Sequence, residues 1–416
     1  MDAWSASRYT GPRKWLIFLM VLLMLVMVQF FRLVPLLPLS EGNMSFATFF
    51  VIALFILIKA GPNKNRLRLR QMRPLMWFMF GILLSFIPAY IYYTQDPFQS
   101  ILTYRKFLCY LTLPLLLVVN PTNDEIRRAF TIFSVLWLVM TVLVTFYMQA
   151  WVDIGDGLLF VEEGDILHTL PGGRLVCLSF IFTLDHYLHN KTTENLLMSI
   201  LMFLCVFIMF SRTILIAALA VILLATVSGR TISSKMTGVA VSILFFAIFT
   251  YLAMDRLGMF IEETTTQLGD VEYNRNKALI YMFASQRDFW TILLGNGYIS
   301  GHVSEIVYEL QEQGIFHSDV GLVGMWHQFG LISIIVILFY AFKGLSRDYS
   351  FVVRGTAVFI LVSSATIGYF AVLECIFWMS LYWFLLVRES ETVKLERERR
   401  RYERMIRMQK YRSISS

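Results

Sequence analysis

The stretch GIFHSDVGLVGMWHQFGLISIIVILFY places a histidine, a serine and an aspartate directly before a long apolar run. A neutral imidazole accepts a proton near pH 7, so His317 is a candidate general base for a reacting hydroxyl group. Asp319 is a candidate to orient His317 or to hold the acceptor molecule. Serine and aspartate are also ordinary helix starters, so a helix N-cap with an incidental histidine is the alternative. His327 lies inside the apolar run and is interpreted as a packed or hydrogen-bonded histidine.

Three arginines are candidates for an anion site. Arg212 follows Ser211 in FMFSRTILIAAL, where a tight turn between two apolar segments brings backbone N–H groups and a guanidinium together. Arg275 begins the helical stretch NRNKALIYMF, with Lys277 close by, and Arg174 follows the turn LPGG. A guanidinium binds phosphate through two parallel hydrogen bonds, which lysine cannot do, so three such arginines suit a pyrophosphate. An arginine that extends its charge to the membrane surface is the alternative for Arg212.

Four further charged residues lie in or beside apolar stretches. Arg105 and Lys106 occur in SILTYRKFLCYLTL, where they either add positive potential near a phosphate or extend to the membrane surface. Arg32 and Glu374 are embedded in apolar segments, and the sequence shows no partner for either. A charge within a membrane segment indicates function by default. Because neither residue has a visible partner in the sequence, both are weaker candidates.

The elements that must position these residues are mainly apolar. Of the 416 residues, 57% are hydrophobic and 16% are charged, whereas a soluble domain carries about 25% charged residues. This composition excludes a soluble enzyme, a disordered regulator and a fibrous repeat, and it indicates an integral membrane protein. The four cysteines lie in apolar stretches and are interpreted as packing residues. There is no Walker loop, no GxGxxG before a helix and no zinc-ligand spacing, so neither a cofactor nor a metal is expected.

Twelve segments approach the length of about 20 mainly apolar residues that a spanning helix needs. The sequence therefore predicts an all-α polytopic membrane protein with about 12 transmembrane helices. The first apolar run is too long for a cleaved signal peptide. Ser211 and Arg212 divide an apolar run into two helices of a hairpin. The predicted segments are 15–37, 44–58, 75–93, 101–119, 130–151, 175–188, 196–210, 213–227, 239–252, 320–341, 351–368 and 371–387.

The distribution of charge predicts the orientation of these helices. With a cytoplasmic N-terminus, most of the 36 lysine and arginine residues lie on the cytoplasmic side, which agrees with the positive-inside rule. Twelve crossings then return the C-terminus to the cytoplasm. The candidate cations lie against this trend at the outer face, where they either pair with acids or bind an anionic substrate.

The same scheme divides the chain into four parts. The large outer loop contains GMFIEETTTQL and ALIYMFASQRDFWTILL, which are apolar at helical spacing and predict short amphipathic helices. Gly295, Gly297 and Gly301 then interrupt the pattern. The basic tail is helical in composition and suits anionic inner-leaflet lipid rather than nucleic acid. The parts are 1–252 with helices one to nine, the loop 253–319, 320–387 with the last three helices, and the cytoplasmic tail 388–416.

Three stretches within 205–341 together resemble the O-antigen ligase and O-antigen polymerase superfamily. FSRTILIAALAVILL is similar to the family's Ser-Arg-Thr helix start. The stretch from NRNKALIYMF to FWTILLGNGYISG is similar to its loop helix with an arginine and a following Gly-x-Gly. HSDVGLVGMWHQFGLISIIVIL is similar to its histidine before a glycine-interrupted helix, although many members have Asn where this chain has Ser318.

The resemblance implies a glycosyltransferase of the bacterial inner membrane with its active site facing the periplasm. The family transfers a glycan from undecaprenyl pyrophosphate to an acceptor, which is lipid A-core for ligases and another lipid-linked repeat unit for polymerases. By resemblance, Arg212 and Arg275 hold the pyrophosphate, the Arg174 region is a further match, and His317 assists the acceptor hydroxyl. The polymerase is slightly preferred, because nothing in the sequence identifies a lipid A-core site.

Two other classes remain open. A lipid-linked oligosaccharide flippase can also have twelve helices, but transporters place polar sites near the bilayer midplane and often have repeated halves. This chain has no matching halves, and its candidate cations lie at one surface beside a large loop. A structural partner of a polysaccharide assembly complex is the third class, and it does not require His317 and the arginines to converge.

Overall fold

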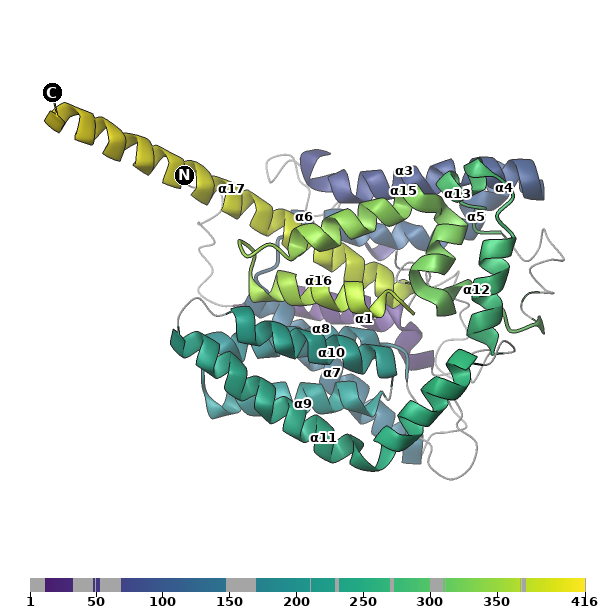
Figure 1. Ribbon diagram of the computed structural model, residues 1–416, viewed down its shortest axis with the longest axis horizontal. Helices are drawn as coiled ribbons and strands as arrows, with labels where there is room; N and C mark the ends of the chain where they lie inside the picture. Colours follow the sequence, from purple (N-terminus) through teal and green to yellow (C-terminus); the bar gives the residue numbers. More distant parts are fainter. Residues whose placement is uncertain are drawn as a thin grey trace.

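The structure is a computed structural model. It describes residues 12–32, 48, 50–52, 69–146, 170–209, 211–228, 232–269, 273–299, 310, 312–366, 368 and 372–415. Every regular element within these residues is a helix, so the predicted all-α class is confirmed (Figure 1). The helical backbone is described at Arg212 and at Asp319, but their side chains lie outside the description.

The first half of the described chain contains α1 (Lys14–Met27), η1 (Gln29–Arg32), η2 (Leu69–Met72), α3 (Arg73–Leu84), α4 (Phe86–Tyr93), α5 (Pro97–Thr103), η3 (Tyr104–Leu111), α6 (Thr112–Val119), α7 (Asn123–Phe146), α8 (Gly173–His189) and α9 (Thr193–Ile208). The second half contains α10 (Arg212–Ser228), α11 (Ile232–Gly269), α12 (Asn274–Ala284), α13 (Phe289–Leu294), η5 (His317–Val320), α15 (Gly321–Gly344), α16 (Phe351–Ser363) and α17 (Leu373–Ser415).

Five helical segments of the described chain are long and apolar enough to cross a membrane, fewer than the twelve predicted. Several predicted segments are shorter or interrupted. One example is α16, whose 13 residues extend about 20 Å, less than the roughly 30 Å hydrocarbon core. The five are Arg70–Tyr93, Pro97–Val119, Asn123–Val144, Lys235–Leu252 and Gly321–Gly344, and shorter apolar helices are Lys14–Met27, Thr193–Ile208, Thr213–Ser228 and Phe351–Ser363.

Two helices continue through predicted boundaries. Helix α11 runs on to Gly269, so the ninth predicted segment and the first expected loop helix form one element. Helix α17 continues through residue 388 to Ser415, so the last apolar segment and the basic tail are one helix. The hairpin predicted at Ser211 is confirmed, because α9 ends at Ile208 and α10 begins at Arg212.

The first part of α17 lies in the centre of the molecule. Its residues from Leu373 to Leu386 are buried all around the helix, apart from slight exposure at Glu374, and Trp378 and Trp383 are completely buried. A helix that is apolar on every face is expected in a protein interior. Beyond Val387 the composition becomes charged and the helix projects away from the bundle (Figure 1).

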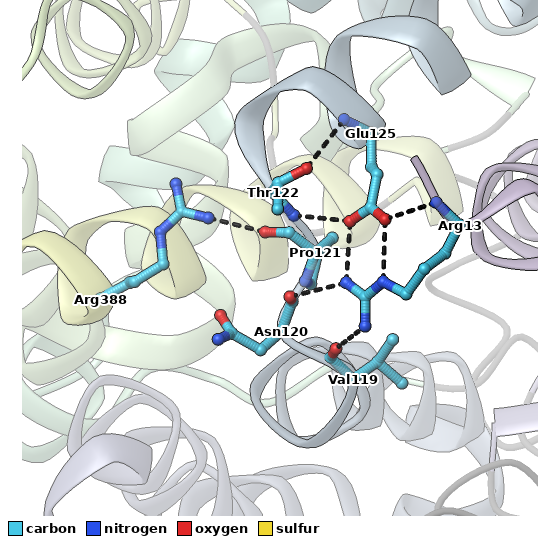
Figure 2. A network of polar contacts seen from close by, with 7 residues as sticks. All are labelled: Arg13, Val119, Asn120, Pro121, Thr122, Glu125 and Arg388. Atoms are coloured by element: carbon cyan, nitrogen blue, oxygen red, sulfur yellow. Dashed lines mark hydrogen bonds and ion pairs between the residues drawn. The ribbon is translucent and has the colours of Figure 1, made fainter. Parts of the chain in front are cut away.

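An arginine–carboxylate pair joins three helices at the end of the bundle where the basic tail emerges (Figure 2). The guanidinium of Arg13 donates two hydrogen bonds of 2.8 Å to the buried carboxylate of Glu125, and it also donates to the carbonyls of Val119 (3.0 Å) and Asn120 (2.9 Å). Asn120 ends α6 in a left-handed conformation, so Arg13 satisfies carbonyls that the helix end leaves unpaired. Arg388 of α17 donates to the carbonyl of Pro121 at 2.7 Å. The network therefore fixes α1 and α17 to the α6–α7 turn.

Candidate functional site

The start of α15 lies beside the start of α10, although the two are distant in sequence. The backbone N–H of Leu322 donates to the carbonyl of Ser364 at 2.9 Å. Two residues later, the hydroxyl of Thr366 donates to Thr213 in the first turn of α10 at 2.7 Å. The loop after α16 therefore brings Arg212, whose side chain lies outside the described part, to the same end of the bundle as η5. Helix N-termini carry unpaired N–H groups and partial positive charge, which favours anions at this end.

Arg174 lies at the same end but is already paired. Its Nη1 atom donates to Glu374 Oε1 at 2.6 Å, and Trp378 donates to its backbone carbonyl at 3.0 Å. Glu374 was a charge without a visible partner in the sequence, and the structure supplies the partner from the start of α8. The pair joins the N-termini of α8 and α17. Because Glu374 neutralises much of the Arg174 charge, Arg174 is a weaker phosphate ligand than its sequence context indicates.

A small apolar core joins α12, η5 and the start of α15 at the right-hand end of the molecule in Figure 1. Its buried members are Ala278, Met282, Leu310, Ile315 and Val320. At the other side of this core, Gly314 packs against Asn274 so closely that a β-carbon would lie 2.7 Å from its side chain. Gly314 therefore lies against the first turn of α12, and the chain continues from there to η5, which carries His317.

Two histidines and a serine form a continuous hydrogen-bonded chain at this place. His317 Nε2 lies 3.0 Å from His327 Nδ1, and His327 Nε2 lies 2.8 Å from Ser285 Oγ. The two imidazole centroids are 4.9 Å apart. His327 is buried with 2% of its surface exposed, whereas His317 is partly buried. The prediction that His327 is hydrogen-bonded is confirmed, and its partner is His317 itself.

A kink in α15 positions His327. Gly330 has non-helical dihedral angles (φ 73°, ψ 176°) in the middle of the helix. The carbonyls of His327 and Gln328 accept hydrogen bonds from the backbone N–H groups of Asn296 (2.7 Å) and Gly297 (2.9 Å). The predicted interruption at Gly295 and Gly297 is confirmed, since α13 ends at Leu294 and both glycines have positive φ. This segment therefore satisfies backbone groups beside the kink and holds the turn that carries His327.

Burial lowers the pKa of His317 to about 4, whereas the ordinary value is about 6.5. The lowered pKa keeps the imidazole neutral at physiological pH, which is the state that a general base requires. Within the described residues, His327 is the hydrogen-bond partner of His317, through Nε2. The Nδ1 atom has no partner among the described residues.

Arg275 lies in the first turn of α12, about 15 Å along the helix axis from Ser285 at its other end. Its side chain is partly buried, and the buried Nε atom has no hydrogen-bond partner among the described residues. Burial of an unpaired guanidinium N–H is costly, so an anionic ligand at this atom would be stabilising. Lys277 is partly buried on the same helix. Among the described residues, α12 therefore carries an unpaired guanidinium N–H near its first turn, and Ser285 at its other end hydrogen-bonds to His327.

Lys106 is buried against an aromatic ring. Its Nζ atom donates to the hydroxyl of Tyr298 at 3.2 Å and lies 4.5 Å from the centroid of that ring. The backbone N–H of Tyr298 in turn donates to the hydroxyl of Tyr104 at 2.5 Å. Lys106 therefore fixes the segment that follows Gly297. Arg105 is partly buried.

Sequence reasoning missed two contributors to this site. Ser285 caps the end of α12, and nothing in its local sequence distinguishes it from other small polar residues. Arg287 lies over the rings of Tyr92 (5.4 Å) and Tyr93 (5.1 Å), where it joins α4 to the start of α13. Its aromatic partners are distant in sequence, with Tyr92 195 residues away, so local sequence gives no signal for this contact.

Among the residues that the structure describes, no three His, Cys, Asp or Glu side chains come together as potential metal ligands. Comparison of the chain with known proteins finds no matching family model and no significant match to a curated protein.

Proposed function

We propose that this protein is a membrane glycosyltransferase that transfers a glycan from undecaprenyl pyrophosphate to a hydroxyl group of an acceptor glycan. The reaction is that of an O-antigen, capsular or exopolysaccharide polymerase or of an O-antigen ligase, with the polymerase preferred. The proposal includes twelve crossings of a bacterial inner membrane, both termini in the cytoplasm and an active site at the periplasmic face.

The observation that carries the proposal is the state of His317. Its imidazole has a lowered pKa, one ring nitrogen is held by His327, and the other has no partner within the described residues. Within the described part of the chain, Nε of Arg275 has no hydrogen-bond partner, and its helix α12 packs against the segment that carries His317. A neutral base and an arginine that can bind an anion suit a reaction that removes one proton and releases an anion.

In the proposed reaction, the acceptor hydroxyl oxygen attacks the anomeric carbon of the donor as His317 Nδ1 accepts the hydroxyl proton. The bond between the anomeric carbon and the phosphate oxygen breaks, and undecaprenyl pyrophosphate leaves with the electron pair. A single displacement of this kind inverts the anomeric configuration. Arg275 and Arg212 stabilise the charge that develops on the pyrophosphate.

The other candidate residues have supporting parts in this proposal. Arg174 contributes less to phosphate binding, because Glu374 already accepts from its guanidinium. Asp319 and Lys277 support the acceptor and the pyrophosphate, respectively. Lys106 and Arg105 add positive potential from η3. No cofactor has a role, and the prenyl chain of the donor enters from the surrounding lipid.

The arginine assignment is tested by substitution in the purified protein. Arg275→Lys keeps the charge but loses the bidentate geometry, so turnover with a defined lipid-linked repeat unit should fall by about tenfold or more. Arg399→Lys is the matched control, because Arg399 lies on the exposed tail helix and pairs with Glu403. Equal turnover of the parent and of Arg275→Lys would contradict the phosphate-binding role.

The acceptor is tested in the same assay. Product chains that lengthen without added lipid A-core support a polymerase, whereas product that forms only with lipid A-core supports a ligase. A flippase would leave the donor chemically unchanged under both conditions.

A further inference from the structure

We propose that His327 and Ser285 act as positioning residues that fix His317 in one tautomer, with its proton on Nε2 and its Nδ1 free as the base. The inference rests on the proposed function, because it assigns how the base of that reaction is prepared. The tautomer itself is a property of the protein that can be measured without any substrate.

The hydrogen-bonded chain has two possible directions. In the first, His317 Nε2–H donates to His327 Nδ1, and His327 Nε2–H donates to Ser285 Oγ. In the second, every bond is reversed, and His317 then carries its proton on Nδ1. Only the first direction leaves Nδ1 as an acceptor, since a neutral imidazole has one donor and one acceptor nitrogen.

The proposed reaction selects the first direction, because only this direction leaves Nδ1 of His317 able to accept the hydroxyl proton. A serine hydroxyl can both donate and accept, so Ser285 Oγ can accept from His327 Nε2 at 2.8 Å in this arrangement. The Tyr281 ring centroid lies 5.9 Å from that of His327 and covers this part of the chain.

The fold holds His327 in the geometry that this arrangement requires. The Asn296 backbone N–H donates to the His327 carbonyl at 2.7 Å, and its side-chain Nδ2 lies 3.4 Å from the same oxygen. The residue is almost completely buried at the kink of α15. These contacts fix the Nδ1 atom of His327 in position to accept from His317 before any substrate binds. A base that is oriented in advance in this way is pre-organised.

The first direction also stabilises the product of proton transfer. When His317 Nδ1 takes the hydroxyl proton, Nε2–H still donates to the neutral His327, so no bond in the chain must be broken or reversed. In the second direction His317 Nδ1 already carries a proton, so His317 could take a further proton only on Nε2. The Nε2–H of His317 would then face the Nδ1–H of His327. His327 accepts a hydrogen bond but takes no proton, and the proton remains on His317.

Two substitutions at one position separate the roles of the two His327 nitrogens. Asn carries a polar atom at the place of Nδ1, and Gln carries one at the place of Nε2. His327→Asn should retain turnover within several-fold, because it still accepts from His317. His327→Gln should lose about 10- to 100-fold in kcat with little change in the donor KM. Equal losses, or better turnover with Gln than with Asn, would overturn the inference.

The tautomer is measured directly by ¹⁵N NMR on histidine-labelled purified protein in lipid. The chain has six histidines, and the signals of His317 and His327 are assigned from their absence in His317→Ala and His327→Ala. At pH 7 both residues should be neutral with the proton on Nε2. A proton on Nδ1 of His317 would overturn the inference even if the protein transfers glycans. The expected spectrum together with no glycosyl transfer would instead reject the proposed function and leave the tautomer assignment standing.

Discussion

Gly295 and Gly330 pass each other backbone to backbone. A β-carbon placed on Gly295 would lie 2.4 Å from the Gly330 nitrogen, and one placed on Gly330 would lie 2.3 Å from the carbonyl oxygen of Leu293. Both glycines have positive φ, which other residues rarely adopt. This close approach lets the 295–297 segment reach the carbonyl of His327, so two glycines distant in sequence determine where the histidine chain lies.

Substitution of either glycine should therefore damage stability and activity together. Gly330→Ala introduces both a steric clash and an unfavourable φ, and it should destabilise the protein by more than about 1 kcal/mol. Thermal unfolding of the detergent-solubilised protein measures the effect. Gly355→Ala is the control, because its β-carbon would meet only side-chain carbons at 3.2 and 3.4 Å inside a helix. A Gly330→Ala protein as stable as the control would show that the crossing does not constrain the fold.

The Arg174–Glu374 pair should behave as a unit. Arg174→Gln leaves the buried carboxylate of Glu374 unpaired, and removing one partner of a buried pair costs about 3–5 kcal/mol. Because the guanidinium is partly exposed, the loss should lie at the lower end of this range. The double variant Arg174→Gln, Glu374→Gln should recover most of the lost stability. Additive losses in the double variant would contradict a direct coupling between the two side chains.

The pH dependence follows from the lowered pKa of His317. A base must be neutral to act, so kcat/KM should stay level from pH 8 down to about 5 and should fall as the pH decreases through about 4. A bound pyrophosphate favours the imidazolium, so kcat should fall at a higher pH than kcat/KM. His317→Ala should lose about 10²–10⁴-fold in turnover and should lack this pH step. A step in the variant at the same pH would assign the base to another group.

The orientation of the chain is tested by cysteine labelling in intact cells. Glu312 is exposed in the segment before η5, and Glu398 is exposed on the tail helix. An impermeant thiol reagent should label Glu312→Cys, whereas it should reach Glu398→Cys only after the cells are opened. The four native cysteines are buried and should give little background. Labelling of both positions in intact cells would reject the proposed topology.

Local sequence signals predicted the parts of the fold that local physics determines. The apolar runs predicted helices such as α10 and α15, and a serine–arginine pair within an apolar run predicted the α9–α10 hairpin. A charge is costly inside a bilayer, so the chain has to turn at Arg212. The same local reasoning placed a loop boundary at residue 253, because it could not show that α11 continues to Gly269 through a less apolar sequence.

Contacts between distant residues could not be predicted in this way. Glu374 and Arg174 are 200 residues apart, and His327 and Ser285 are 42 residues apart. Their pairing depends on how α8, α12, α15 and α17 pack, for which one sequence holds no direct signal. The sequence therefore indicated His317 as a candidate base, but it did not reveal the two residues behind it or the glycine crossing that positions them.

The most direct test of the account is the fate of the donor lipid. Purified protein in detergent, without a membrane gradient, is supplied with a defined undecaprenyl-pyrophosphate-linked repeat unit, and free undecaprenyl pyrophosphate and new glycosidic bonds are quantified together. The parent protein should release one carrier for each bond formed, and His317→Ala should release it about 10²–10⁴-fold more slowly. Intact donor with no free carrier, in the presence of acceptor and of any required partner proteins, would contradict a glycosyltransferase.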